Sequence, residues 1–388
     1  MNKAKIVTCQ APVNIAVIKY WGKRNDELIL PINDSISASL CLDHMCAKTT
    51  IIASPDFKET KFWLNGELQP TDNRRLQNCL KEMKKRANSN LECLKWHLNI
   101  CSENNFPTAA GLASSAAGYA CLVYALSQIY EIKTNISSIA RIGSGSACRS
   151  VFGGWVRWYK GETYEGSDSV AEQVAPETHW PEMRVLILVV DDQKKTYSST
   201  SGMKTSVETS EFLQYRAAKI VPQRIEDMVD AIKNKNFQKF AQLTMQDSNQ
   251  FHSVCLDTYP PCFYLNDTSR TIIELVHHYN QFKGEIKVAY TFDAGPNACL
   301  YLLEENVSEV VEMINYVFPP KPTIMSNYFK GIDISITTPD EKLISSVSNF
   351  QQTEGKLKYI IYTKVGRGPR VLEKSEEHLL TESGMPKH

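Results

Sequence analysis

Apolar and polar residues alternate along several short stretches of the chain, which is the pattern of half-buried β-strands. The alternation runs through residues 6–18 and returns at 94–102, and two further β-rich runs lie within 45–64. At the end of the second run, Asn65-Gly66 is a two-residue signal for a hairpin turn. The first third of the chain is therefore predicted to be rich in strands.

Further strands and several helices are predicted from the same kind of pattern. Later β-type stretches lie at 183–190, 287–294, 297–303 and 358–365. Apolar residues at helical spacing predict helices at 72–87, 116–131, 137–143, 209–233 and 236–248. We expect the first of these helices to begin at Asp72 and to end in Lys and Arg residues, as the helix dipole favours. The mixed order of strands and helices predicts an α+β fold.

The length of the chain, 388 residues, exceeds one ordinary hydrophobic core and suits two domains. We expect an N-terminal lobe at 1–190 and a C-terminal lobe at 191–388, with the polar segment 191–204 as the passage between them. Lys plus Arg and Asp plus Glu number 43 each, and this balance argues against a protein that binds nucleic acid or a membrane surface. The longest apolar run, at 185–190, is far too short to span a bilayer.

The eleven cysteines indicate the compartment rather than a metal site. They form no CxxC pair, which excludes the usual zinc-ribbon and thioredoxin motifs, and most lie in apolar surroundings like buried thiols of a reducing compartment. His277-His278 has no acidic partner at metal-ligand spacing, so we expect no metal site built from side chains. The N-terminal residues lack the apolar core of a signal peptide, and a cytoplasmic location is expected.

The stretch PTAAGLASSAAG, residues 107–118, lies between a predicted strand and a predicted helix. Such a loop can bind phosphate, because free N–H groups and the helix dipole favour an anion there and small residues let it approach. Ser114 and Ser115 can add hydroxyl donors. No Lys follows the Gly as in a Walker A motif, and the spacing is not GxGxxG. The alternative is that small residues simply let the helix pack closely on a sheet.

The stretch APVNIAVIKYWGKR, residues 11–24, gathers cations at the end of a predicted strand. Lys19, Lys23 and Arg24 flank the tripeptide YWG. A charge-assisted hydrogen bond to phosphate contributes about 1.5–3 kcal/mol, so a few of them can hold a diphosphate. The alternative is solvated charge on a surface turn.

GSGSACRS, residues 143–150, is a second loop of small residues, with Arg149 three positions after Ser146. Its hydroxyls and N–H groups can surround an anion, and Arg149 can bind a carboxylate or phosphate through two parallel hydrogen bonds. The alternative is a turn followed by a surface Arg.

TFDAGPN, residues 291–297, places Asp293 where a strand runs into a turn. The functional interpretation is a carboxylate aimed at a reacting hydroxyl, and the alternative is an Asp that starts a turn.

These motifs, together and in this order, resemble the eukaryotic-type mevalonate diphosphate decarboxylase family of the GHMP kinase superfamily. Residues 107–118 resemble the ATP phosphate-binding loop of the superfamily, and VETS (207–210), MQDSNQFH (245–252) and CLDTYPP (255–261) extend the resemblance over nearly the whole chain. Ala109 and Ala113 stand where the kinases tend to have Gly, and DAGPN replaces the glycine-rich third kinase motif. Both departures favour the decarboxylase over mevalonate or phosphomevalonate kinase.

The resemblance implies a two-lobed GHMP kinase-like fold, with a ribosomal protein S5 domain 2-like N-terminal lobe and an α/β-sandwich C-terminal lobe. It also implies a reaction: ATP phosphorylates the 3-hydroxyl of mevalonate 5-diphosphate, phosphate then leaves, and loss of CO2 gives isopentenyl diphosphate for isoprenoid and sterol synthesis. Mg²⁺ accompanies the ATP, and the family suggests a homodimer.

The resemblance further assigns residues to roles. The catalytic residues are Asp293, Lys19 and Arg149. The substrate-binding residues are Tyr20, Trp21, Gly22, Lys23, Arg75, Ser144, Gly145, Ser146, Ala147, Cys148, Arg149 and Thr200. The ATP-binding residues are Ala109, Ala110, Gly111, Leu112, Ala113, Ser114 and Ser115. Bacterial members have an Arg before Gly202-Met203, where this chain has Ser199-Thr200-Ser201, so only Thr200 is carried over as a substrate-side hydroxyl.

The assigned chemistry fits these residue types. A free carboxylate has a pKa of about 3.9 and is a weak base, but phosphoryl transfer is loose enough for Asp293 to orient the hydroxyl and take its proton late. The same carboxylate can stabilise positive charge when phosphate leaves the tertiary carbon. A kinase of the same superfamily that stops at the phosphate ester, and a non-catalytic nucleotide-binding protein, remain the alternatives. The presence of Lys19, Ser115, Arg149 and Asp293 argues against the latter.

Overall fold

The computed structural model of the protein describes residues 4–106, 114–191, 198–334 and 340–387. The largest sheet lies mainly in the N-terminal half of the chain and has six strands. Across the sheet their order is β17 (Arg370–Leu372), β1 (Lys5–Pro12), β6 (Cys46–Ser54), β9 (His97–Asn104), β7 (Lys61–Leu64) and β8 (Glu67–Gln69).

A second, four-stranded sheet continues the N-terminal lobe. Its order is β11 (Ala171–Ala175), β10 (Trp155–Trp158), β5 (Ser35–Ser39) and β2 (Asn14–Ile18). A small two-stranded sheet of β3 (Lys23–Asn25) and β4 (Leu30–Pro31) lies next to it in the chain. The end of β2 leads directly into the YWG tripeptide, so this sheet presents the cationic segment found in the sequence.

The third sheet belongs to the C-terminal lobe. Its order is β13 (Val288–Phe292), β14 (Ala298–Leu303), β12 (Met183–Val189), β16 (Tyr359–Lys364) and β15 (Phe329–Gly331). Strand β12 precedes residue 190 in the chain but pairs with β14 and β16. Strand β17 comes after all of these strands and pairs with β1 of the first sheet. The chain therefore passes between the two lobes both after β11 and after β16.

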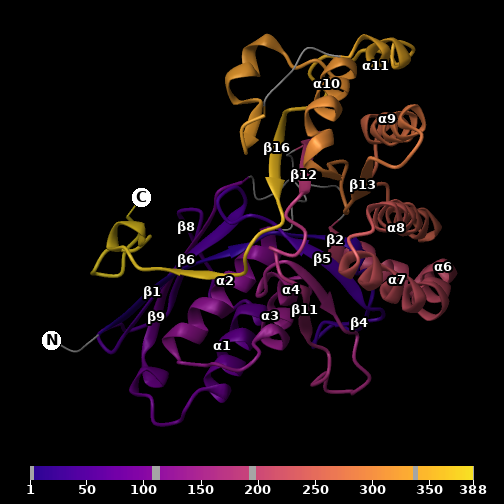
Figure 1. Ribbon diagram of the computed structural model, residues 1–388. Helices are drawn as coiled ribbons and strands as arrows, with labels where there is room; N and C mark the ends of the chain where they lie inside the picture. The colour runs from indigo at the N-terminus through magenta and orange to yellow at the C-terminus, as the bar shows by residue number, and fades with distance from the viewer. Residues whose placement is uncertain (1–3, 107–113, 192–197, 335–339, 388) are drawn as a thin grey trace.

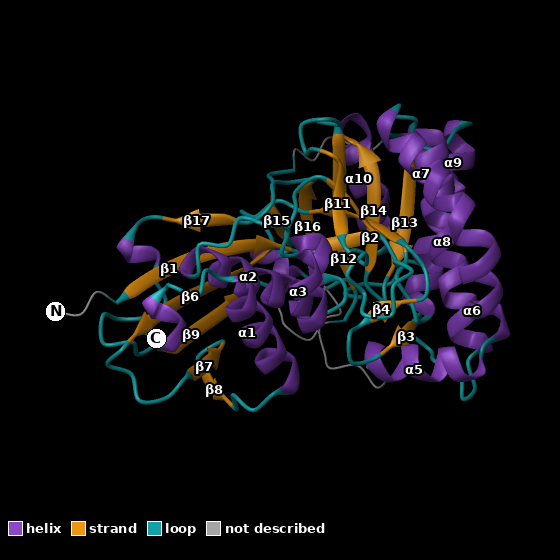
Figure 2. Cartoon of the chain, turned by 90° about the horizontal axis from the view of Figure 1, so that it is seen from below, coloured by secondary structure: helices purple, strands orange, loops and turns teal. Residues whose placement is uncertain are grey.

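Helices cover these sheets and connect the lobes. In the described residues they are α1 (Arg74–Arg86), α2 (Ser114–Ile129), α3 (Ser137–Gly143), α4 (Ala147–Ser150), α5 (Ser199–Thr209), α6 (Glu211–Tyr215), α7 (Val221–Lys233), α8 (Phe237–Asp257), α9 (Asp267–Lys283), α10 (Val307–Val317) and α11 (Glu341–Ser346). In Figure 1 the C-terminal sheet and α10 rise above the N-terminal lobe, and α6 to α9 stack on the right. Figure 2 shows α1, α2 and α3 beside the strands β1, β6 and β9.

Two helices matter most for the site. Helix α2 packs against β1 and β6, and α8 packs against both β13 and β2. The small residues Ala116, Ala117 and Ala120 of α2 are fully buried, because a helix without large side chains can approach a sheet closely. The small residues within α2 therefore allow close packing on the sheet. This packing leaves open whether the residues at the start of the helix bind an anion.

Several local predictions are confirmed. The hairpin between β7 and β8 turns at Asn65 and Gly66, which have φ angles of 49° and 82°, the left-handed region that such a turn requires. The helix predicted at 137–143 is α3 with the same bounds. Helix α1 begins slightly later than expected, because Asn73 rather than Asp72 caps it and accepts the N–H groups of Arg75 and Leu76.

Other boundaries differ from the prediction. The segment expected as a polar passage ends in α5, whose Ser198 cap accepts the N–H of Ser201. The single helix expected at 209–233 is divided, since Ser210 caps α6 and a π-helical turn occupies Arg216–Ile220. Helix α5 is rich in Ser and Thr and contains a Gly, which have weak helix propensity, so the spacing of apolar residues did not predict it.

Candidate active site

A cavity of about 290 Å³ lies where the end of β2, the start of α2, the 143–150 segment and the turn after β13 meet. The residues assigned from the sequence that line it are Lys19, Tyr20, Trp21, Lys23, Arg75, Ser114, Ser115, Ser144, Gly145, Ser146, Arg149, Thr200 and Asp293. Those that do not line it are Gly22, Ala147 and Cys148. The remaining ones, which lie outside the described residues, are Ala109, Ala110, Gly111, Leu112 and Ala113.

An ion pair between Lys19 and Asp293 forms part of the cavity wall. The Lys19 Nζ lies 2.5 Å from the Asp293 Oδ1. Lys19 directly follows β2 and Asp293 directly follows β13, so the two strand ends bring them together. The Lys19 side chain is 3% exposed and that of Asp293 is 33% exposed, so the carboxylate is the partner that faces the cavity. Within the described residues Oδ2 accepts no hydrogen bond, which leaves it open toward a ligand.

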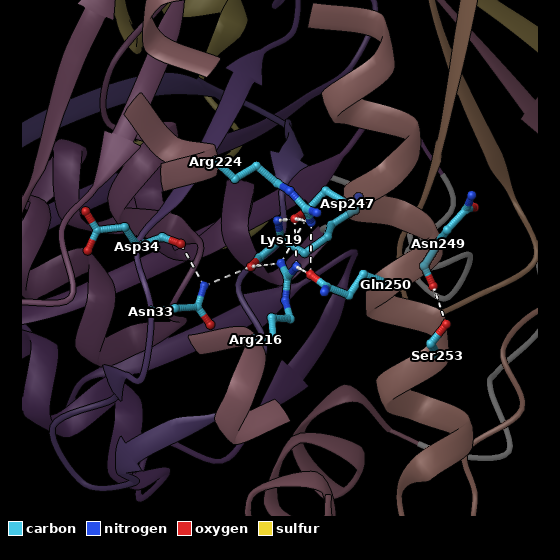
Figure 3. Close-up of polar contacts among 9 residues, drawn as sticks. All are labelled: Lys19, Asn33, Asp34, Arg216, Arg224, Asp247, Asn249, Gln250 and Ser253. Atoms are coloured by element: carbon cyan, nitrogen blue, oxygen red, sulfur yellow. Dashed lines mark hydrogen bonds and ion pairs between the residues drawn. The ribbon is translucent and has the colours of Figure 1, made fainter. Parts of the chain in front are cut away.

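A buried carboxylate, Asp247 of α8, contacts Lys19 (Figure 3) and is not part of the cavity lining. It accepts the backbone N–H of Lys19 at 2.7 Å and forms ion pairs with Arg216 and Arg224. Burial alone would raise the pKa of Asp247, but the two guanidinium groups and the Lys19 N–H outweigh it and lower the pKa below its usual value. Asp247 is therefore a carboxylate whose charge is compensated inside the protein.

Arg149 is held by hydroxyl and amide oxygens rather than by a carboxylate. Its Nη1 donates to Ser35 Oγ at 2.5 Å, and its Nε donates to Ser37 Oγ at 2.9 Å and Asn14 Oδ1 at 3.2 Å. Burial lowers the pKa of this guanidinium, although Arg stays protonated in proteins. Within the described residues its Nη2 has no hydrogen-bond partner. In the described residues no carboxylate is hydrogen-bonded to this buried cation, which favours binding of an anion.

The segment 143–150 is built closely around Tyr20. A Cβ on Gly145 would lie 2.8 Å from Cε1 of Tyr20, so only glycine fits without a shift. The Tyr20 ring packs on Trp158 with 4.6 Å between centroids, and its buried hydroxyl has no partner among the described residues. Burial raises the pKa of this hydroxyl well above its usual value, so Tyr20 stays a neutral donor.

The other members of the cationic segment have different environments. Trp21 is buried between Phe251 and Tyr264, and its Nε1 donates to Ser206 Oγ at 2.9 Å. Lys23 forms an ion pair with Asp26 at 2.9 Å.

Arg24 points away from the cavity and donates to the carbonyl oxygens of Lys160 and Gly161. Of the three cations found in this stretch of the sequence, Lys19 and Lys23 therefore contribute to the cavity and Arg24 does not.

Ser114 and Ser115 begin α2 and lie between two cavities. The Ser115 Oγ lies 3.2 Å from the Ser144 Oγ, so the two small-residue segments touch. The second cavity measures about 480 Å³, and its lining is largely apolar, with Phe62, Leu76 and Tyr119 among the residues. A phosphate at the start of α2 could thus have the rest of a nucleotide beside it.

Arg75 and Thr200 enter the first cavity from the N-terminal ends of α1 and α5. Both helices are capped in the turn that presents these residues, α1 by Asn73 and α5 by Ser198. Caps of this kind fix the first turn, so the guanidinium of Arg75 and the hydroxyl of Thr200 are carried by ordered backbone.

Sequence reasoning missed Asn14, which lines the cavity, and His252, a buried ring that interacts electrostatically with Lys19 and Asp293. Asn14 lines the cavity, accepts from Arg149 and donates to Ser150 Oγ at 2.7 Å and the Ser146 carbonyl at 3.0 Å. It stands within an alternating apolar stretch, and a polar residue at a buried strand position was the available signal. His252 of α8 packs beside Phe251 and Phe292, and burial lowers its pKa to about 3. A lone His in a helix gives no such signal.

No group of three or more His, Cys, Asp or Glu side chains that could hold a metal ion occurs in the described residues. Among the same residues, no helix combines the length and apolar character needed to cross a membrane.

Two family models match the chain. Residues 11–171 match the diphosphomevalonate decarboxylase-like N-terminal domain, and residues 185–372 match the mevalonate 5-diphosphate decarboxylase C-terminal domain. Diphosphomevalonate decarboxylase of Danio rerio is 53% identical over 393 aligned residues, which cover 100% of this chain and 98% of that relative. These likenesses extend over both lobes and favour a decarboxylase over a kinase of the same superfamily.

Solved structures give the same result. Mevalonate diphosphate decarboxylase from Trypanosoma brucei superposes with a TM-score of 0.86 at 38% identity, covering 96% of this chain and 99% of that one. A protein called MDDEF, in complex with MVAPP, AMPPCP and magnesium, superposes with a TM-score of 0.74 at 30% identity, covering 96% of this chain and 100% of that one. The predicted α+β, GHMP kinase-like fold is thereby confirmed.

Proposed function

The chain belongs to the mevalonate 5-diphosphate decarboxylase family, and we propose that it converts mevalonate 5-diphosphate and ATP into isopentenyl diphosphate, ADP, phosphate and CO2. The observation that carries this proposal is the Lys19–Asp293 pair in a cavity that Arg149 and Ser115 also line. A carboxylate open to the cavity, a buried cation and the residues that begin α2 thus line the same cavity.

In the first step Asp293 orients the 3-hydroxyl of the substrate. Its oxygen Oδ1 is held by Lys19, so Oδ2 is left to accept the hydrogen bond from the hydroxyl. As the oxygen of this hydroxyl bonds to the γ-phosphorus of ATP, the bond to the β-phosphate oxygen breaks and ADP leaves. The hydroxyl proton passes to Asp293, which is adequate in a loose phosphoryl transfer dominated by positioning.

In the second step the bond between C3 and the new phosphate oxygen breaks, and phosphate takes the electron pair. The leaving phosphate takes back the proton that Asp293 accepted in the first step, so Asp293 is again a carboxylate. Positive charge develops on the tertiary carbon close to this carboxylate, which stabilises it electrostatically. The bond to the carboxylate carbon supplies the electrons of the new double bond, and CO2 leaves. The buried Lys19 keeps Asp293 in place through both steps.

We assign the substrate carboxylate to Arg149 with Ser144 and Ser146. The support is that Arg149 is a buried cation whose free Nη2 has no carboxylate partner in the described residues. The diphosphate is assigned to the segment of Tyr20, Trp21, Gly22 and Lys23 together with Arg75, all but Gly22 of which line the cavity. Thr200 adds a hydroxyl from α5.

We assign the ATP phosphates to the loop before α2 and to Ser114 and Ser115. The support is that these two serines line both cavities, and that the second cavity is apolar enough for a nucleoside. The same role is proposed, from the sequence alone, for Ala109, Ala110, Gly111, Leu112 and Ala113, which lie outside the described residues.

Mg²⁺ is proposed to enter with ATP. Such an ion is held mainly by phosphate oxygens and water. The hydroxyl of Ser115 is the side-chain oxygen that fits as an additional ligand. When bound, the ion neutralises charge on the transferring phosphoryl group.

We also propose a cytoplasmic location, which is supported by the eleven free cysteines, since free thiols persist in a reducing compartment. The proposed product, isopentenyl diphosphate, places the reaction in isoprenoid and sterol synthesis.

A homodimer is supported by exposed apolar residues on neighbouring segments: Phe212, Tyr215, Leu256, Tyr259 and Phe263. A Phe263→Glu variant should then elute as a monomer in size-exclusion chromatography.

The proposed reaction is tested by incubating the protein with mevalonate 5-diphosphate, ATP and Mg²⁺. ADP release is measured by a coupled assay, and CO2 is captured from substrate labelled in the carboxylate. We expect one CO2 per ADP. Release of ADP without CO2 would instead identify a kinase that stops at the phosphate ester.

A further inference from the structure

Two adjacent residues of α8, Asp247 and Ser248, bind the two strand ends that carry the Lys19–Asp293 pair. Asp247 Oδ2 accepts the N–H of Lys19 at 2.7 Å, and Ser248 Oγ accepts the N–H of Phe292 at 3.0 Å. Phe292 is the residue directly before Asp293. Both α8 side chains are completely buried, so these hydrogen bonds are sheltered from water.

The backbone of Lys19 is fixed on its carbonyl side as well. Its oxygen accepts from Asn33 Nδ2 at 3.1 Å and from Arg216 Nη2 at 3.3 Å (Figure 3). Arg216 also donates to both oxygens of Asp247, at 2.7 and 2.9 Å, which sets the orientation of that carboxylate. The peptide groups on both sides of Lys19 are thus held by one charged unit.

Among the described residues, strand β2 does not pair with β13. Strand β2 lies in the four-stranded sheet and β13 in the five-stranded sheet, and the bridge that joins these two sheets, Leu40–Val365, follows two other strands, β5 and β16. Helix α8 packs against both strands. The hydrogen bonds of Asp247 and Ser248 are therefore the direct polar links from a single rigid element to both strand ends.

We propose that Asp247 and Ser248 are positioning residues that set the distance between Lys19 and Asp293 during turnover. The proposal rests on the function proposed above. Neither side chain lines the cavity, so both act through the pair and not on the substrate. A displacement of about 1 Å at a reacting group can cost about a hundredfold in rate, which is why two buried hydrogen bonds at this place affect catalysis.

The sharpest test is Ser248→Ala, because it removes one hydroxyl without leaving a buried charge. Ser253→Ala is the matched control: the same substitution in the same helix, with a hydroxyl that bonds the Asn249 carbonyl at 2.9 Å (Figure 3). Ser248→Thr, which retains the acceptor oxygen, serves as the rescue variant. Asp247→Asn is a second variant, but it leaves Arg216 and Arg224 without their charged partner and can fail to fold.

Rates are divided by the number of substrate-binding sites, titrated with mevalonate 5-diphosphate, so that unfolded protein is not counted. For Ser248→Ala we expect kcat per site to fall about 10- to 100-fold while both KM values change less than about twofold. Ser253→Ala keeps the wild-type kcat, and Ser248→Thr recovers most of it. A crystal structure of Ser248→Ala should show the Lys19 Nζ to Asp293 Oδ1 distance beyond hydrogen-bonding range.

A fall of less than about fivefold in kcat per site, or an equal fall in Ser253→Ala, overturns the inference. So does a loss that appears in KM rather than in kcat. Wild-type protein in the same assay separates the two proposals: if it releases ADP and CO2 and Ser248→Ala matches it, the positioning role alone is wrong. If wild type releases no CO2, the proposed function is wrong and the positioning role falls with it.

Discussion

Lys19 and Asp293 lie 274 residues apart in the chain, and their Nζ and Oδ1 atoms lie 2.5 Å apart. Each residue directly follows a strand, and the two strands belong to different sheets and different lobes. Two separate strand ends thus produce one ion pair, in which Lys19 is buried and a carboxylate oxygen of Asp293 is open to the cavity. The consequences for substrate and rate can be measured one residue at a time.

Asp293→Asn should abolish most of the turnover while substrate binding changes little. The amide keeps the shape of the side chain but can neither accept the hydroxyl proton nor stabilise a developing positive charge. We expect kcat to fall by about a thousandfold or more and the substrate Kd to stay within about threefold. Single-turnover ADP release and calorimetric titration measure the two quantities. Asp56→Asn, on an exposed turn, is the control, and a loss below tenfold would contradict the assigned role.

Arg149→Gln should weaken binding of mevalonate 5-diphosphate but not of isopentenyl diphosphate, which has no carboxylate. Hydrogen bonds from a guanidinium to a carboxylate contribute about 1.5–3 kcal/mol, so we expect a Kd about 10- to 100-fold higher for the substrate alone. Arg149→Lys keeps the charge and loses the planar guanidinium, so its Kd for mevalonate 5-diphosphate should lie between those of wild type and Arg149→Gln. Equal weakening for both ligands would move Arg149 from the carboxylate to the diphosphate.

Gly118→Leu should raise the KM for ATP and leave the KM for mevalonate 5-diphosphate unchanged. Gly118 lies in α2 and lines the second cavity, where a Cβ would meet no atom within 4 Å. The large side chain occupies space that we assign to the nucleoside, and a rise of about tenfold or more is expected. Gly118→Ala is the matched control, since alanine favours the helix and leaves the cavity nearly intact. Steady-state kinetics, with each substrate varied in turn, measure the two KM values. A rise in the KM for mevalonate 5-diphosphate instead of the KM for ATP would exclude the assignment of the second cavity to the nucleoside.

Periodicity and turn chemistry predicted much of the local structure. The hairpin at Asn65-Gly66 and helix α3 follow directly from short-range preferences, which act within a few residues. Ser114 and Ser115 were recognised because a run of small residues before a helix has few other uses than close packing or anion binding. In both examples the information lies in neighbouring residues.

The rest of the site depends on contacts between distant segments. The spacing of apolar residues around Asp247 predicts a helix and nothing more about this residue. Its burial beside Lys19, Arg216 and Arg224 depends on segments that come together only in the folded protein. Asn14 is similar, because its partners at 146, 149 and 150 come from another part of the chain. Strand β12 was predicted as a strand, but its place in the C-terminal sheet is a matter of pairing partners that no local pattern reveals.

His252 should make the folded protein less stable as the pH falls below neutral. Burial, and after it the positive charge of Lys19, lowers the pKa of this ring to about 3, whereas in the unfolded chain the pKa of a His is about 6.5. Between these values the unfolded chain binds a proton that the folded protein does not, so the contribution is complete above about pH 6.5 and is lost toward pH 3. From pH 7.5 to pH 5 the loss amounts to about 2 kcal/mol.

The matched variant is His252→Phe, which keeps an aromatic ring beside Phe251 and Phe292 and removes the titrating group. Urea unfolding at pH 7.5 and pH 5 measures the free energy of unfolding of both proteins. We expect wild type to lose about 2 kcal/mol more than the variant over this interval. The substitution His97→Phe, at an exposed position, should leave the wild-type difference unchanged. Equal losses in wild type and His252→Phe would mean that the ring is hydrated in the folded protein, and that α8 packs less tightly against the Lys19 strand than the contacts of Asp247 and Ser248 require.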